Sequence, residues 1–293
     1  MRVMKVLPFL PSMLREPCLR RTWLSSALLR ATALELIVLA GHVLLYPAGI
    51  TDERRDPARP PEPPFEPSTA PAGTAALPVE SPDRPPVVLL HGFIDNRSVF
   101  VLLRRSLTRH GWHHLESLNY SPLTCDIRTA AELLGRHVEE ICGRTGHHEV
   151  DIVGHSLGGL IARYYVQRLG GDRRVRTLVT LGTPHGGTAV APMASAHPIV
   201  RQMRSGSAPI EELRRPAPGC RTRFVSFWSE LDQVIVPAEA ACIDHPDLDA
   251  QNVRVSGIGH LALPVHPAVA AGIRHALESP EAAPGLAGTA SVA

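Results

Sequence analysis

One serine lies in a setting that could make it a nucleophile. The segment GHSLG at 154–158 fits the pattern G-x-S-x-G around Ser156. An apolar run precedes this motif and an amphipathic run follows it, which predicts a strand, a sharp turn and a helix. Such an elbow raises the serine hydroxyl above the sheet, and small flanking residues leave room for the strained turn. We therefore predict that Ser156 is a catalytic nucleophile.

A serine hydroxyl reacts slowly at neutral pH unless a base takes its proton and a carboxylate orients that base. In sheets with this elbow the partners follow in the order serine, acid, histidine, at the carboxyl ends of later strands. Asp232 follows the apolar run RFVSFW, and His260 follows VRVSGIG. We predict that His260 is the general base and that Asp232 orients it.

Other acids and histidines compete for these two roles. Glu230 is the alternative acid, because it lies two residues before Asp232. Three more acids lie in a polar loop that is typical of solvated caps, and three histidines lie before the last strand or on the predicted final helix: Asp244, Asp247, Asp249, His245, His266 and His275. Chain order and strand-end position favour Asp232 and His260 over all of them.

The oxyanion that forms during acyl transfer needs two backbone N–H donors, each worth a few kcal/mol. The residue after the nucleophile supplies one, which is Leu157, and the loop after the first core strand supplies the other. In that loop, HGFIDN at 91–96, Gly92 lets the backbone turn, so we expect Phe93 to be the second donor. His155 and His185 abut core turns and are predicted to fix loops by hydrogen bonds.

The elements that position these residues follow from the alternation of apolar runs and amphipathic stretches. Strands are predicted over 86–92, 112–120, 148–155, 175–184, 222–230 and 252–259. Helices are predicted over 97–110, with Asn96 as N-cap, and over 127–142, 157–169 and 266–278. Strands that alternate with helices predict an α/β fold with a mainly parallel central sheet flanked by helices.

The N-terminal fifty residues carry a different pattern. The first thirty residues hold six basic residues and one acid. They are followed by an apolar run, and counted from Trp23 to Tyr46 this run is long enough to span a bilayer. Three interpretations stay open: a membrane anchor, a cleaved signal peptide, and a core helix of the globular domain. Glu35 and His42 favour the last, because each is costly in lipid. The first two place the catalytic domain outside the cytoplasm, membrane-anchored or secreted.

Composition sets the domain boundaries. We expect a basic N-terminus with the anchor or signal segment over 1–50, and a Pro-rich linker over 51–85. The catalytic domain is expected over 86–279, and a disordered tail over 280–293.

Charge and cysteine content exclude some function classes. The net charge of +2 and the lack of a dense basic stripe argue against a nucleic-acid partner. No pair of the five cysteines forms a CxxC, which argues against a zinc site. In an exported domain Cys125–Cys142 and Cys220–Cys242 are the pairing closest in sequence, but two other pairings, or free buried thiols, are equally open.

Five motifs together resemble the α/β-hydrolase superfamily, and within it the bacterial class 2 lipases and esterases, which are triacylglycerol lipase-like. The motifs are LLHGF (89–93), IVGHSLGGLIARYY (152–165), LVTLGTPHGGT (178–188), DQVIVP (232–237) and GIGHLALP (257–264). The resemblance implies the α/β-hydrolase fold, with the N-terminal apolar helix outside its core. It also implies hydrolysis of carboxylic esters through an acyl-enzyme. We expect no cofactor and no metal, because the calcium site of some related lipases has no recognisable acidic cluster here.

The same resemblance implies a triad of Ser156, Asp232 and His260, with Phe93 and Leu157 as oxyanion donors. The expected partners are an ester or lipid substrate and, through the N-terminal segment, a membrane. A modest candidate for a lid is 189–220, whose apolar residues are scattered. Two other functions stay open: acyl transfer to an alcohol on the same triad, and a non-catalytic, membrane-tethered binding module.

Overall fold

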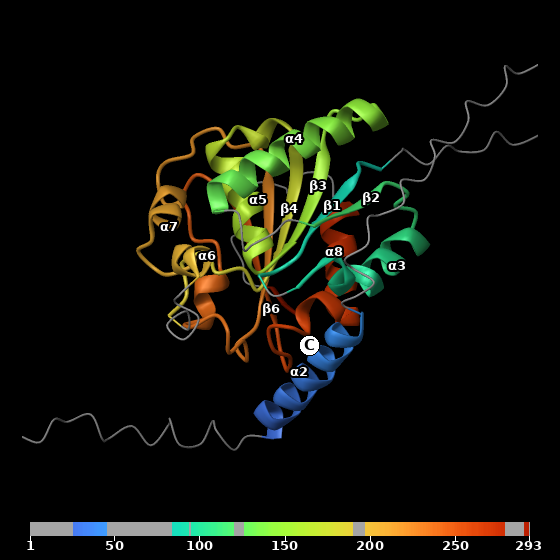
Figure 1. Cartoon of the computed structure of the whole chain (residues 1–293), viewed down its shortest axis with the longest axis vertical. Coiled ribbons are helices and arrows are strands. Elements are labelled where there is room, and N and C mark those ends of the chain that lie inside the picture. Colours follow the sequence, from blue (N-terminus) through green and yellow to red (C-terminus); the bar gives the residue numbers. More distant parts are fainter. Residues whose placement is uncertain are drawn as a thin grey trace, which may run out of the picture.

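A computed structural model describes residues 26–45, 84–93, 95–119, 126–189, 197–278 and 290–292 (Figure 1). The predicted linker over 51–85 lies outside the described residues, apart from its last two positions.

The centre of the molecule is a parallel sheet of seven strands in the order β2-β1-β3-β4-β5-β6-β7. The strands are β1 Val87–Leu90, β2 Leu115–Leu118, β3 Val150–His155, β4 Val175–Leu181, β5 Arg223–Trp228, β6 Asp249–Val255 and β7 Ala290–Val292. The parallel α/β sheet predicted from the sequence is therefore confirmed, and the order reverses direction at β1, next to β3. All residues of β1 and β3 are buried, as expected for central strands that are covered on both faces.

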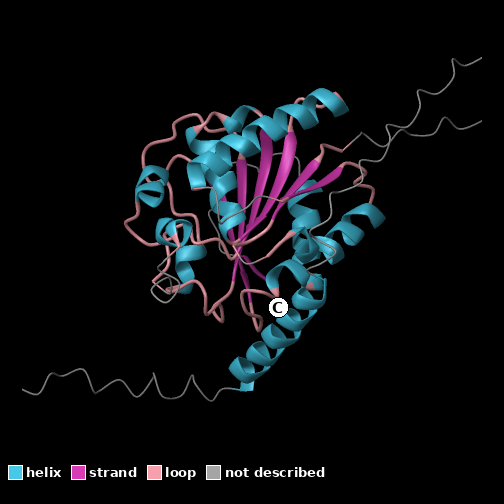
Figure 2. Ribbon diagram, viewed as in Figure 1, coloured by secondary structure: helices cyan, strands magenta, loops and turns pink. Residues whose placement is uncertain are grey.

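Helices cover both faces of the sheet (Figure 2). Two of them, α4 (Ile127–Thr145) and α5 (Leu157–Arg168), pack on one face. On the other face lie α3 (Val101–Arg109), which a 3-10 turn precedes, and α8 (Pro267–Glu278). Each layer encloses its own apolar core against the sheet.

Caps fix the ends of these helices where the sequence places them. The Asn96 side chain accepts a hydrogen bond from the Ser98 N–H at 2.9 Å, which confirms the predicted N-cap of the turn that leads into α3. Asp126 does the same for α4 through the Thr129 N–H at 2.8 Å. Gly146 ends α4 with φ +75°, a left-handed conformation that glycine adopts without strain.

The candidate lid contains two short helices, α6 (Pro198–Gln202) and α7 (Ala208–Leu213), which periodicity did not predict. Their apolar residues pack into the core beneath α5. The Glu212 carboxylate on α7 accepts hydrogen bonds from Arg128 at 2.6 Å and from the Tyr164 hydroxyl at 2.5 Å, which lower the pKa of Glu212 to about 2. This part of the segment is therefore held to the domain, and residues 190–196 lie outside the described residues.

The N-terminal helix α2 (Ser26–Leu45) lies outside the sheet and packs on the domain surface. Ala31 is buried, and Leu34 and Val38 lie against the core on the α3 and α8 side. The opposite side of α2 exposes Leu29, Leu36, Ile37 and Leu44.

No helix in the described ranges is both long enough and apolar enough to cross a membrane. The membrane-spanning helix that the sequence suggested between Trp23 and Tyr46 is thus not supported. The third interpretation, a core helix of the globular domain, agrees with the structure in part: α2 packs against the domain, but it lies on the surface and exposes one side.

The structure also bears on the predicted C-terminal tail and on the cysteines. Residues 290–292, predicted as part of a disordered tail, instead form β7, because the edge of β6 offers unpaired backbone groups to another strand. Cys142, Cys220 and Cys242 are free cysteines, so the Cys220–Cys242 bridge is not formed. Cys125 lies outside the described residues.

Candidate active site

Ser156 occupies the turn between β3 and α5. Its φ of +52° and ψ of −118° make it the one non-glycine residue with positive φ in the described part of the chain. The Ser156 N–H donates to the Leu181 carbonyl at 2.9 Å, and the Thr183 hydroxyl donates to the Ser156 carbonyl at 3.0 Å. Contacts from the end of β4 therefore hold the strained backbone that the motif predicted.

The glycines of the motif are required by close packing. A Cβ on Gly158 would lie 2.6 Å from the His91 carbonyl oxygen and even closer to that of Leu90. A Cβ on Gly154 would lie 2.6 Å from the Cα of Gly159. Neither position has room for a side chain, because the start of α5 packs against the end of β1 at Gly158 and against the end of β3 at Gly154.

His260 and Asp232 form a buried pair beyond the ends of β6 and β5. The distance from His260 Nδ1 to Asp232 Oδ2 is 2.7 Å. The other carboxylate oxygen of Asp232 accepts from the N–H groups of Val234 at 2.8 Å and Ile235 at 2.9 Å. The carboxylate is thus fixed from both sides, and it holds the imidazole in one orientation.

Burial and charge act in opposite directions on His260. Burial disfavours the imidazolium and would lower its pKa, but the charge of Asp232 and its hydrogen bond outweigh this effect. Asp95 and Glu35 add smaller contributions in the same direction, so the pKa of His260 is raised above 6.5. The ring is therefore a stronger base than a free histidine.

The end of β4 brings the pair and the serine together. Gly182 has φ +52°, and a Cβ there would lie 2.9 Å from His260 Nδ1 and 3.1 Å from Asp232 Oδ2. The preceding residue, Leu181, accepts the hydrogen bond from Ser156. Among the described contacts the Ser156 hydroxyl makes no hydrogen bond to the His260 ring, a bond that is often long until substrate binds.

A second acid–histidine pair lies beside the first. His155 Nδ1 is 3.1 Å from Asp95 Oδ2, and His155 Nε2 is 3.3 Å from the His260 carbonyl oxygen. The rings of His155 and His260 lie 4.8 Å apart. His155 therefore bridges the loop after β1 and the loop after β6, which confirms the predicted structural role. Asp95 was not predicted, although its place after the HGF motif could have indicated it.

The two predicted oxyanion donors belong to segments that lie next to the serine. Leu157 is the first residue of α5, so its N–H belongs to the positive end of that helix. The backbone before Phe93 passes close to the nucleophile, because a Cβ on Gly92 would lie 3.3 Å from Ser156 Cβ. The Phe93 ring lies 5.2 Å from the His197 ring and packs against the apolar core that contains Leu157.

The competing residues serve elsewhere. Glu230 is exposed and faces Arg254 at 3.6 Å. His245 Nε2 lies 3.0 Å from the Arg215 carbonyl, and Asp247 accepts from the Ala217 N–H at 2.7 Å. His185 is buried and contacts the Thr180 hydroxyl at 3.0 Å, which agrees with its predicted role in a turn. His266 precedes α8, and His275 lies in its last turn.

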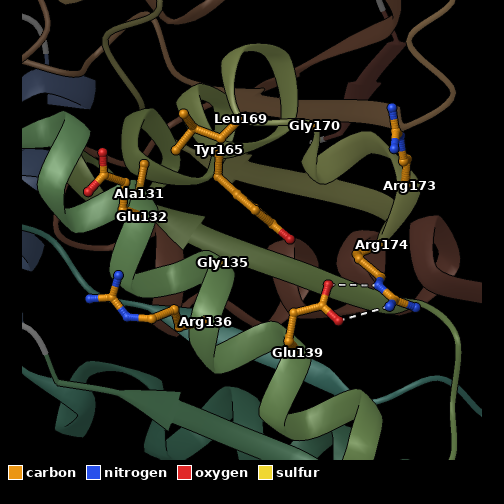
Figure 3. A pocket seen from close by; sticks show the side chains of 10 residues that line it. All are labelled: Ala131, Glu132, Gly135, Arg136, Glu139, Tyr165, Leu169, Gly170, Arg173 and Arg174. Atoms are coloured by element: carbon orange, nitrogen blue, oxygen red, sulfur yellow. Dashed lines mark hydrogen bonds and ion pairs between the residues drawn. The ribbon is translucent and has the colours of Figure 1, made fainter.

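A pocket of about 610 Å³ lies at the opposite end of the sheet (Figure 3). It opens between α4 and α5, and Arg174, which precedes β4, pairs across it with Glu139 at 2.8 Å. Because the reactive residues lie past the carboxyl ends of the parallel strands, this pocket is separate from the candidate active site.

Comparisons with known proteins agree with this architecture. The family model of palmitoyl protein thioesterases matches residues 86–217. Triacylglycerol lipases of Pseudarthrobacter phenanthrenivorans and Burkholderia plantarii are each 30% identical over 116 residues, which is 37% of this chain. The match spans about a third of these relatives, 35% and 32% of their length. The matched family region contains Ser156, Phe93 and Leu157, but neither Asp232 nor His260.

Solved structures share the fold at low identity. The mature lipase BlEst2 of Bacillus licheniformis superposes with a TM-score of 0.57 and 16% identity, covering 69% of this chain and 96% of that one. Lipase B of Aspergillus fumigatus gives 0.60 and 16%, covering 67% and 53%. The chain therefore has the α/β-hydrolase fold, and parts of its sequence are similar to triacylglycerol lipases and to the palmitoyl protein thioesterase family.

Proposed function

We propose that this protein hydrolyses carboxylic esters with lipid-like acyl groups, through an acyl-enzyme on Ser156. One observation carries the proposal. A strained serine at a strand-to-helix elbow lies at the same end of the sheet as a buried imidazole, which is held by a carboxylate at 2.7 Å. A strained backbone and a buried ionisable pair both cost folding free energy, and a nucleophile with its base requires both.

In the first half-reaction the Ser156 oxygen attacks the ester carbonyl carbon, and His260 Nε2 takes the hydroxyl proton. The negative charge moves to the carbonyl oxygen, where the N–H groups of Phe93 and Leu157 receive it. When the tetrahedral intermediate collapses, the bond to the alcohol breaks and His260 passes the proton to the leaving oxygen. Asp232 stabilises the imidazolium between these steps.

In the second half-reaction a water molecule takes the place of the alcohol. His260 removes a proton from this water as it attacks the acyl carbon. The bond to Ser156 Oγ then breaks, the serine regains a proton from His260, and the carboxylic acid leaves. An alcohol in place of the water would give acyl transfer, so added acceptor alcohol and product analysis distinguish the two reactions.

A second candidate substrate is a fatty acyl thioester. The match to the palmitoyl protein thioesterase family favours it. The same attack, proton transfer and oxyanion contacts would serve, with a thiol as the leaving group. Parallel assays with p-nitrophenyl esters and acyl-coenzyme A thioesters of equal chain length would rank the two substrates.

The test compares wild type with Ser156→Ala on p-nitrophenyl esters of increasing acyl length. We expect Ser156→Ala to lose about 10³-fold or more in kcat with the fold retained. Ser205→Ala, at an exposed serine, is the matched control and should keep wild-type rates. Equal activity of wild type and Ser156→Ala would reject the proposal. Failure of a fluorophosphonate to label the wild type would favour the non-catalytic binding module.

A further inference from the structure

A carboxylate from the N-terminal helix binds the backbone next to the candidate base. Glu35 on α2 accepts a hydrogen bond from the Leu261 N–H at its Oε2 and one from the Ala262 N–H at its Oε1, each at 2.9 Å. These two residues follow His260 directly. The contact joins positions more than two hundred residues apart, and Figure 1 shows α2 (blue) beside the segment after β6.

The chain on both sides of this contact is shaped for it. A Cβ on Gly259 would lie 2.6 Å from the Glu35 carboxyl carbon, so only glycine lets the carboxylate approach. On α2, Ala31, Leu34 and Val38 precede or follow Glu35 by one helical turn or less and pack against the domain. The apolar side of the helix thus carries the carboxylate into place.

The chemistry of the contact favours a fixed geometry. Two successive N–H groups that converge on one carboxylate form an anion-binding nest, and hydrogen bonds to a charged acceptor are stronger than neutral ones. The backbone that follows His260 is therefore clamped by Glu35, while the imidazole itself is held by Asp232. The His260 carbonyl oxygen faces His155, so the residue is held on three sides.

We propose that Glu35 is a positioning residue for His260 and that α2 is a working part of the catalytic unit. This inference rests on the proposed function, since it assigns a role relative to the proposed base. Glu35 contacts neither substrate nor the reacting atoms; it acts through the loop that carries the imidazole. The carboxylate also explains why an otherwise apolar helix keeps one acid.

Three carboxylates raise the pKa of His260, namely Asp232, Asp95 and Glu35, and the neighbouring His155 ring lies 4.8 Å from the His260 ring. Removal of the Glu35 charge should lower the pKa of His260, because that charge stabilises the imidazolium. The acidic limb of the rate profile would then move to lower pH. A residue that only helps α2 to pack would not move that limb.

The experiment measures kcat, KM and the pH profile of the full chain on a p-nitrophenyl ester. We expect Glu35→Ala to lower kcat by about 10- to 100-fold, as a misplacement of about 1 Å does, with KM little changed. Glu35→Gln should also be slower, since an amide has one acceptor oxygen and turns its NH₂ toward the other N–H. Thr32→Ala, at an exposed position of α2, is the matched control.

Gly259→Ala tests the same contact from the other side. Its methyl group would displace the carboxylate, so kcat should fall as in Glu35→Ala. In the Glu35→Ala background the same substitution should add little, because the contact is already lost. If Glu35→Ala does not fold, Glu35→Gln and Gly259→Ala carry the test.

A lower kcat with unchanged KM and an acidic limb at lower pH supports the inference. Wild-type kcat in folded Glu35→Ala, or a lower kcat with the limb in place, overturns it. Ser156→Ala separates this result from the proposed function. If that variant keeps its activity, the function fails, and NMR titration of His260 in Glu35→Ala still shows whether the charge acts on the ring.

Discussion

The conformation of Ser156 is the feature from which the site is built. A non-glycine residue with positive φ costs about 1–3 kcal/mol, and the hydrogen bonds of the Ser156 backbone with the Leu181 carbonyl and the Thr183 hydroxyl hold it there. The glycines around Ser156 allow the close packing of this turn, because α5 begins against the carbonyl groups of Leu90 and His91. Two glycine substitutions test this packing.

Gly158→Ala should disrupt the elbow, because its methyl group would overlap the carbonyls of Leu90 and His91. We expect a loss of about 1–3 kcal/mol of unfolding free energy, as in other overpacked sites, together with loss of serine labelling. Gly143→Ala is the control, since that glycine is exposed on α4 with nothing near its Cβ; it should stabilise by about 1 kcal/mol. Equal effects in thermal unfolding would contradict the packing argument.

Asp232→Asn should lower kcat by about 10⁴-fold, because an asparagine favours the wrong tautomer of His260 and cannot stabilise its cation. Glu230→Gln, two residues away on the surface, should keep wild-type activity. A smaller loss in Asp232→Asn than in Glu230→Gln would show that the acid is misassigned.

The pH dependence follows from the same pair. Catalysis needs neutral His260, whose pKa is raised above 6.5, so activity should fall as the pH drops through a value above 6.5. The contribution of His260 to the free energy of unfolding changes with pH in the opposite direction. The folded protein favours the protonated ring, so this contribution is present below pH 6.5 and is lost as the pH rises through the raised pKa. An acidic limb of kcat/KM below pH 6 in the wild type would contradict this.

Among the secondary-structure elements, a buried ion pair links two strands and a helix. Asp151 in β3 is fully buried, and Arg176 in β4 donates to it at 2.6 and 3.0 Å. The same guanidinium donates to the Leu277 carbonyl in α8 at 2.8 Å. Burial raises the pKa of Asp151 and outweighs the opposing effects of Arg176 and Thr177.

Arg176→Leu should therefore destabilise the fold by about 3–5 kcal/mol, because it leaves an unpaired carboxylate in the core. Arg254→Leu removes an arginine whose contact with Glu230 is long and exposed, and should cost less than about 1 kcal/mol. Denaturant unfolding of both variants at pH 7 measures the difference. Equal midpoints would mean that the Asp151 pair contributes little.

The elements differ in how far the sequence predicts them. Long buried runs predict β1, β3, β4 and β5 well, because an apolar run bounded by turn residues leaves few alternatives. The short helices α6 and α7 could not be predicted from hydrophobic periodicity, since five or six residues are too few to show a helical period. Their packing beneath α5 decides their structure.

At the scale of the molecule, the site depends on contacts that no local pattern contains. Chain order and strand-end position predicted Asp232 and His260, whose side chains the structure brings together at 2.7 Å. The place of Asp95 after the HGF motif was a usable signal, but its pairing with His155 and the docking of α2 depend on partners far away in sequence. An isolated acid in an apolar helix was the available signal for Glu35, and three interpretations fitted it.

The most direct test of the central claim is to trap the acyl-enzyme. Wild-type protein is mixed with a p-nitrophenyl ester, quenched in acid within the first turnover, digested and analysed by mass spectrometry. The account predicts one acyl group on the peptide that contains Ser156, absent in Ser156→Ala. Hydrolysis that proceeds with no acylated serine, or with the acyl group on another peptide, would contradict it.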